Sequence, residues 1–167
     1  MSKLFYLKTS QREHVLRHFH AKDMAGSHFY SDVFVSPEGL LDYINSVEPI
    51  HTILQSRTRN AYCFVNTSGQ AVGTSGLAKR SNLDENCIIR QTRDGYTIEI
   101  GLVDQMPETH SFCVIADESP DGFSVITAFP GDYARPFALK SQPADEYELN
   151  KKFWEEHVLL KLKNTMQ

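Results

Sequence analysis

The chain has 167 residues, of which 41% are hydrophobic and 23% are charged, and its formal net charge is −4. This composition supplies apolar side chains for one core and excludes a chain that is disordered throughout. No run of 18 apolar residues occurs, which excludes a transmembrane helix, and we expect one cytoplasmic domain over residues 1–167 that makes no contact with a membrane.

Residues 1–48 are predicted to be a helical section. Val15, Leu16 and Phe19 recur at helical spacing in a helix expected from Gln11 to about His20. A second helix is indicated where a serine precedes a proline, with Ser36 as N-cap and Pro37 as its first residue.

Residues 50–130 change to the period of β-strands. Short segments rich in β-branched and aromatic residues lie near 52–57, 61–66, 86–92, 96–103, 111–116 and 123–129. Asp94-Gly95 predicts a hairpin between residues 88–92 and 96–103. Asp121-Gly122 predicts that a longer loop connects residues 112–116 to residues 123–129. Residues 76–86 are expected to form an exposed loop.

A final helix is predicted from about 144 to 163, because Tyr147, Phe153, Trp154, Val158 and Leu162 recur at helical spacing. The predicted fold class is therefore α+β. It has N-terminal helices, an antiparallel sheet of at least four strands, and a C-terminal helix packed on that sheet.

Charge is unevenly distributed along the chain. Residues 1–22 carry five basic side chains and one acidic one, whereas residues 104–148 carry nine acidic side chains against Arg135 and Lys140. The pattern is compatible with a local basic site, and equally with a solvated basic face. Cys63, Cys87 and Cys113 lie far apart, which favours buried free thiols over disulfides or a zinc site.

The densest polar cluster includes His14 and His18, which lie one helical turn apart on the same face. Arg17 and Lys22 are close to them in sequence. Two imidazoles beside cations suit RNA cleavage by the 2′-hydroxyl, because one group accepts a proton and another protonates the leaving oxygen. Each histidine could equally be structural. The pair also has the spacing of two zinc ligands, although no third ligand is evident.

A second candidate region is the strand that ends at Pro130. Its alternation is expected to put Val125, Thr127 and Phe129 on one face, with the Thr127 hydroxyl at the lip of a cleft. Tyr133 and Arg135 follow, the first suited to stacking on a base and the second to binding a phosphate.

The early His-x-x-x-His helix, the Gly-Ser-His-Phe segment Gly26–Phe29 and the late segment Val125–Pro130 together resemble the ribonuclease toxin fold group. That group includes barnase, EndoU, the colicin tRNases and RelE-like toxins. The resemblance implies N-terminal helices beside an antiparallel sheet with the active site on the sheet face. It also implies site roles: His14 or His18 for acid and base, Ser27 and Thr127 for the hydroxyls, and Lys22 or Arg135 for the phosphate clamp.

These observations lead to a hypothesis of a metal-independent endoribonuclease of toxin or phage type that acts on tRNA or mRNA without a cofactor. The proposed catalytic residues are His14, His18 and Thr127. Substrate binding is assigned to Arg17, Lys22, Ser27, Tyr133 and Arg135. One alternative is a non-catalytic interaction protein, such as an immunity protein, antitoxin or phage accessory protein, and an immunity or antitoxin protein is also a possible partner. Another is an enzyme that uses Cys63 or Cys113 as a nucleophile.

Overall fold

The structure of the chain is a computed structural model that describes residues 3–16, 19, 28–30, 32–56, 58–93 and 96–163. The described residues form the α-helices α1 (Thr9–Leu16), α2 (Pro37–Ile44) and α3 (Ala144–Glu156). Their strands are β1 (Phe5–Tyr6), β2 (His28–Phe29), β3 (His51–Leu54), β4 (Arg59–Val65), β5 (Gly73–Thr74), β6 (Leu77–Lys79), β7 (Ile88–Arg93), β8 (Tyr96–Val103), β9 (Glu108–Thr109), β10 (Ser111–Ser119), β11 (Gly122–Pro130) and β12 (His157–Leu162). Two short 3-10 helices, η1 (Arg80–Asn82) and η2 (Glu85–Cys87), separate β6 from β7.

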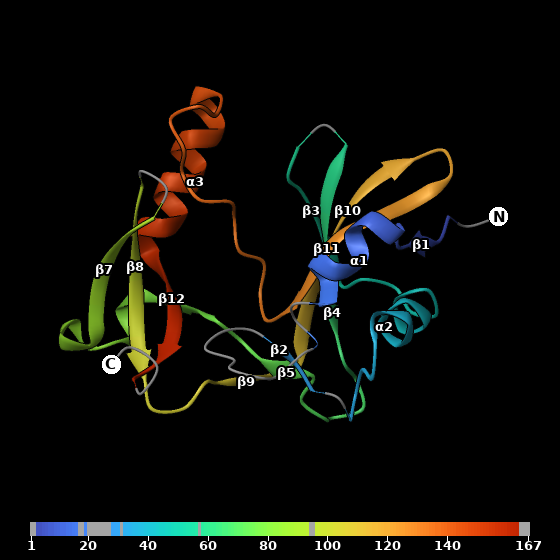
Figure 1. Ribbon diagram of the computed structural model, residues 1–167, viewed down its shortest axis with the longest axis horizontal. Coiled ribbons are helices and arrows are strands. Elements are labelled where there is room, and N and C mark those ends of the chain that lie inside the picture. Colours follow the sequence, from blue (N-terminus) through green and yellow to red (C-terminus); the bar gives the residue numbers. More distant parts are fainter. Residues whose placement is uncertain are drawn as a thin grey trace.

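The strands form two main sheets that stand next to each other in Figure 1. The first, called the β10 sheet, has the order β1-β11-β10-β4-β3, and the second, called the β8 sheet, has the order β6-β12-β8-β7. A small sheet of β2, β5 and β9 lies between them along the lower edge of that view. The mixed helix and strand content agrees with the predicted class, and β3, β4, β10 and β11 form the predicted antiparallel arrangement of four strands. The expectation that one sheet takes in all of residues 50–130 is wrong. Strands β7 and β8 belong to a separate sheet, and β1 and β12 pair in parallel with β11 and β8.

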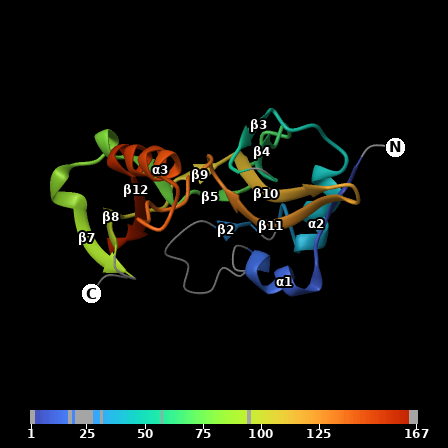
Figure 2. The same cartoon turned by 90° about the horizontal axis from the view of Figure 1, so that it is seen from above.

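The β10 sheet has an aromatic core on the face covered by α1 and α2. Figure 2 shows α1 lying against β11 from one side. Phe64 and Phe112 stack with ring centroids 5.1 Å apart, and Phe29 and Phe34 meet Phe112 edge to face. Val15 of α1 is buried in the same cluster. Burial of these large rings is the main stabilising contribution to this sheet.

Helix α2 begins as its sequence predicts. The Ser36 hydroxyl accepts a hydrogen bond from the Gly39 amide at 3.3 Å, and Pro37 is the first helical residue. Helix α1 starts two residues earlier than expected, at Thr9, and its described part ends at Leu16. The section 1–48 also contains β1 and β2, which are too short to have a recognisable period.

The expected helix over residues 144–163 is wrong in its second half. Helix α3 ends at Glu156, and residues 157–162 form β12, which pairs in parallel with β8 and antiparallel with β6. Val158 and Leu160 are buried while their neighbours are less so, which is the alternation of a strand. Backbone pairing on both sides of β12 explains why this segment is extended.

Residues 76–86 are only in part the exposed loop that the sequence predicts. Residues 81, 82 and 84–86 are exposed, but Leu77–Lys79 form β6, which pairs with β12, and the short helix η1 follows. Leu83 then packs over Gly101 of β8, where an added Cβ would lie 2.3 Å from the Leu83 side chain. This contact helps to close the smaller hydrophobic cluster around Met106, Val158 and Leu160.

Both predicted hairpins are present, with one difference in loop length. Strands β7 and β8 pair antiparallel across residues 94–95. Strands β10 and β11 pair as far as Ser119 and Gly122, so their connection is a tight two-residue turn and not a longer loop. Gly122 has φ of 136°, a conformation that only glycine adopts readily. Among the described residues, none of the helices is long and apolar enough to cross a membrane.

Candidate functional site

The sequence-predicted site residues are dispersed. His14 lies partly buried on α1, Thr127 lies on β11, and Tyr133 and Arg135 lie in the segment after β11. The remaining four fall outside the described residues: Arg17, His18, Lys22 and Ser27.

A β-bulge in β11 determines which way Thr127 faces. Thr127 pairs with Ile115, but Ala116 pairs with Val125, which leaves Ile126 as an extra residue. Val125 and Ala128 both belong to the aromatic core, so the neighbour of Ala128, Thr127, faces the opposite side of the sheet. The prediction that Val125 and Thr127 share a face is therefore wrong.

His14 and Thr127 consequently do not meet. Helix α1 covers the core face of the β10 sheet, where Val15 contacts the same apolar cluster as Val125. His14 lies on the helix that covers the core face, and Thr127 lies on the opposite face of the sheet. His18, the second histidine of the predicted cleft, lies outside the described residues.

The face that carries Thr127 also holds two cysteines. Cys63 and Cys113 are directly paired across β4 and β10, with their sulfur atoms 3.6 Å apart. The contact with Cys63, together with burial, raises the pKa of the Cys113 thiol. A buried thiol with a raised pKa is a poor nucleophile, which opposes the alternative of catalysis by Cys113.

Tyr133 and Arg135 are held by specific hydrogen bonds. The Tyr133 hydroxyl donates to Gln55 Oε1 at 2.9 Å, and burial raises the pKa of Tyr133. Arg135 Nε donates to Asn150 Oδ1 at 2.8 Å. Asn150 is the buried polar residue of α3, with 2% of its surface exposed. Each of the two predicted binding residues is therefore held by a side-chain hydrogen bond.

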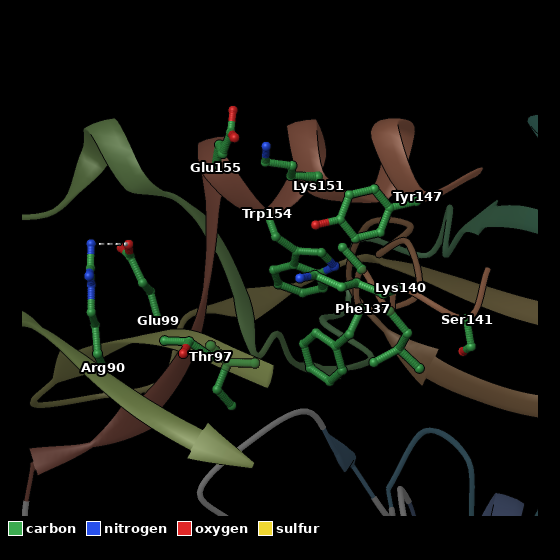
Figure 3. Close-up of a pocket in the computed structure, with 13 residues that line it drawn as sticks. Arg90, Thr97, Glu99, Phe137, Lys140, Ser141, Tyr147, Lys151, Trp154 and Glu155 are labelled. Carbon is green, nitrogen blue, oxygen red and sulfur yellow. Dashed lines mark ion pairs between the residues drawn. The ribbon is translucent and has the colours of Figure 1, made fainter. Parts of the chain in front are cut away.

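A cavity lies between α3, residues 137–141 and strands β7 and β8, and we call it the aromatic pocket. Its volume is about 810 Å³. Three aromatic side chains line it, together with three cations; the six are Phe137, Tyr147, Trp154, Arg90, Lys140 and Lys151. Figure 3 shows the three rings grouped together, with Arg90 and Glu99 apart from them on the strands. The helical spacing of Tyr147 and Trp154 predicts instead that both pack on the sheet.

Helix periodicity brings three of these residues together. Tyr147, Lys151 and Trp154 follow the i, i+4, i+7 spacing of one helix face. Trp154 is fixed further by its indole N–H, which donates to the carbonyls of Arg135 at 3.2 Å and Pro136 at 3.0 Å. The Phe137 ring lies 4.9 Å from the Trp154 ring, at an interplanar angle of 39°.

Hydrogen bonds from Gln142 hold the segment of residues 137–141, which lines the aromatic pocket. Gln142 Nε2 donates to the Phe137 carbonyl at 2.9 Å, and Gln142 Oε1 accepts from the Leu139 amide and from Asn150 Nδ2. The segment from Phe137 to Gln142 is thereby tied to α3. A wall held in this way is preorganised for binding, since it needs no ordering when a ligand enters.

Three cations line the aromatic pocket, Arg90, Lys140 and Lys151, against the two carboxylates of Glu99 and Glu155, and this excess of one positive charge favours an anionic ligand. Glu99, which is 19% exposed, forms ion pairs with Arg80 and with Arg90, the latter at 3.8 Å. Its negative charge is thus compensated by neighbouring cations. Lys140 and Lys151 are both exposed at the rim, where a cation can meet an anionic group without full desolvation.

None of the comparisons assigns the chain to a family. No protein-family model, no curated protein and no solved structure matches it. The resemblance to the ribonuclease toxin group thus stays a hypothesis drawn from short motifs. Within the described part of the chain, no three His, Cys, Asp or Glu side chains gather as metal ligands would.

Proposed function

We propose that this protein binds single-stranded RNA through the aromatic pocket, with a base stacked among the rings and the phosphate backbone near the lysines. The observation that carries the proposal is the presence of Phe137, Tyr147 and Trp154 in the same cavity as Lys140 and Lys151. Aromatic side chains beside cations are the usual means of holding single-stranded nucleic acids, because rings stack on bases and cations neutralise phosphates.

The dimensions of the pocket support this assignment. Ligand cavities usually measure about 300–1,000 Å³, and a cavity of about 810 Å³ has room for a nucleotide. Trp154 is the only tryptophan of the chain, so its fluorescence reports on the pocket directly.

Binding is measured by titrating a short single-stranded oligoadenylate and following Trp154 fluorescence. Phe137→Ala should weaken binding about ten-fold or more, since stacking contributes roughly 1–3 kcal/mol per base. Lys151→Gln should weaken it about two- to ten-fold through the loss of one cation. Lys152→Gln is the matched control, because Lys152 is exposed on the same helix but does not line the pocket. Equal effects of the two lysine variants would contradict the proposal.

Metal-independent cleavage of the bound RNA is our second candidate. It is supported by the Tyr147 and Ser141 hydroxyls and the Glu99 carboxylate, which line the same cavity as Arg90, Lys140 and Lys151. Attack by the 2′-hydroxyl needs groups that transfer protons and cations that stabilise the charged phosphorane. Because Thr127 lies on the far side of the β10 sheet from α1, a reaction at His14 would have to proceed without it.

Cleavage is tested by incubating the protein with total tRNA and with mRNA in EDTA. Discrete fragments that end in 2′,3′-cyclic phosphate, with DNA left intact, would support the endoribonuclease hypothesis. His14→Ala and Tyr147→Phe then separate the two locations, because the first lies on α1 and the second in the pocket. Intact RNA despite binding would leave a non-catalytic RNA-binding protein.

The interaction-protein alternative gains less support from the structure. The acidic residues between 104 and 148 lie on several elements, namely β9, β10, the loops and α3. Several already have partners: Asp117 with Arg59, Glu118 with Lys3, Asp104 with Lys163, and Glu108 with Tyr30. In the basic N-terminal segment, Arg12 likewise pairs with Glu38.

A further inference from the structure

A second, smaller cavity is lined by Pro136 and Gln142, the residues that flank the segment 137–141 of the aromatic pocket. Its volume is about 170 Å³, and it lies between the β3–β4 turn and the N-terminal part of α3. We call it the arginine pocket, because Arg59 and Arg135 line it. Its other lining residues include Gln55, Ser56, Glu146 and Asn150.

The two arginines differ in how their charge is compensated. Arg59 donates to both carboxylate oxygens of Asp117, at 2.8 and 3.0 Å, so its charge is compensated. Arg135 uses Nε for Asn150, and among the described residues no carboxylate lies within 4.0 Å of its guanidinium. The terminal nitrogens of Arg135 therefore remain as donors beside the cavity.

Arg135 is held in place at both ends. Its carbonyl accepts the Trp154 indole N–H at 3.2 Å, and its Nε donates to the buried Asn150 at 2.8 Å. Asn150 is itself fixed through Nδ2 by Gln142. An arginine whose Nε is anchored presents its two terminal nitrogens in a defined direction, which suits recognition of a tetrahedral oxyanion.

We propose that the arginine pocket is a phosphate site, in which Arg135 holds one backbone phosphate of the single-stranded RNA whose base lies in the aromatic pocket. This inference rests on the proposed function. Trp154 connects the two cavities physically, because it lines the first and is hydrogen-bonded to the backbone of Arg135, which lines the second. The Glu146 carboxylate lines the same cavity and repels an anion, so it weakens phosphate binding. Removal of its charge therefore tests the site.

The test compares adenosine, a short oligoadenylate and inorganic phosphate as ligands. Arg135→Gln should weaken oligoadenylate binding roughly ten-fold, which corresponds to the loss of one charged hydrogen-bonded contact. It should also reduce the slope of log affinity against log salt concentration by about one, as expected for one lost phosphate contact. Adenosine, which has no phosphate, should bind the variant as it binds the wild type. Arg12→Gln, which removes a cation from α1 far from both pockets, should change neither affinity.

A variant that is expected to bind more tightly distinguishes an effect on the site from misfolding. Glu146→Gln should tighten oligoadenylate and inorganic phosphate, because it removes a repulsive charge without changing the shape of the side chain. Unfolding cannot produce tighter binding. Arg135→Lys should fall between wild type and Arg135→Gln, since it keeps the charge and loses the fork of donors.

The two proposals fail in different ways. If adenosine and oligoadenylate both leave Trp154 fluorescence unchanged, the RNA-binding proposal is wrong. The arginine pocket is then still tested by calorimetric titration of inorganic phosphate into wild type, Arg135→Gln and Glu146→Gln. Oligoadenylate affinity that is indifferent to Arg135 and Glu146 would overturn the phosphate site, as would phosphate binding that is equal in all three proteins.

Discussion

The β10 sheet and the β8 sheet use their aromatic residues in opposite ways. Around the β10 sheet, Phe29, Phe64 and Phe112 are 0–1% exposed and pack on one another under two helices. Around the β8 sheet, the rings of Phe137 and Trp154 stay partly exposed and line a cavity. The first region thus gains stability from its aromatic residues, whereas the second keeps them accessible to a ligand.

The largest expected effect comes from opening the core of the β10 sheet. Phe112→Ala should lower the free energy of unfolding by about 3–5 kcal/mol, because it removes a buried ring that contacts Phe64 and Phe34 and leaves a cavity. The reaction of Cys63 and Cys113 with a thiol reagent reports on this sheet, since both are buried in it. The measurement is made in a Cys87→Ser background, and unchanged thiol protection would contradict the assignment of this core.

Leu160→Ala is the matching variant in the β8 sheet. Its side chain is 3% exposed in the smaller cluster, and truncation should cost about 2–4 kcal/mol. Because the two clusters are separate, the denaturation curve of Trp154 fluorescence should shift more than that of thiol exposure. Equal shifts of both curves would show that the two sheets unfold as one unit.

A smaller effect is expected at the junction that holds both pockets. Asn150→Leu keeps the approximate volume but leaves Arg135 Nε without its partner, while Gln142 Oε1 loses Asn150 Nδ2 and keeps the Leu139 amide as a donor. The cost should be about 1–3 kcal/mol, the penalty for unsatisfied buried polar groups. The fluorescence midpoint of the variant measures this loss. A neutral or stabilising outcome would mean that the network does not order the segment.

The smallest expected effect concerns Asp117. The hydrogen-bonded Arg59 lowers the pKa of Asp117, so the pair stabilises the fold above the ordinary carboxyl pKa of about 3.9. That contribution is lost as the pH falls through the lowered value of the folded state. Both side chains are about a third exposed, so Asp117→Asn should cost only about 0.2–1 kcal/mol at pH 7. Denaturant titrations of both proteins at pH 7 and pH 2 should show this difference shrinking at the lower pH.

The sequence predicts the regular parts of the fold well. The six long strand segments are present to within a few residues, because alternation and Asp-Gly turns are local signals. The cap at Ser36 is equally local. Strands such as β1 and β5 have two residues each and therefore no period. Strand β12 was missed because Val158 and Leu162 fit a helix and a strand equally well, and pairing with β8 decides between them.

The candidate site was less predictable for a related reason. The spacing of Tyr147, Lys151 and Trp154 is visible in the sequence, but it is also the pattern of a helix that packs its aromatic face on a sheet. Whether this helix face packs on a sheet or borders a cavity depends on the positions of residues 137–141 and of β7 and β8. No local sequence pattern predicts that these segments come together. The bulge at Ile126, which turns Thr127 away from α1, likewise has no sequence signal of its own.

The position of β12 inside its sheet has a consequence for how the chain is synthesised. All strands of the β10 sheet end by Pro130, so this sheet can form before α3 leaves the ribosome. In the β8 sheet, β6 and β8 meet only through β12, which ends at Leu162. Translation adds about 5–20 residues per second, and until it passes this point the nascent chain exposes two unpaired strand edges. A translational pause between residues 131 and 156 would thus prolong the interval in which these strand edges can pair with another chain.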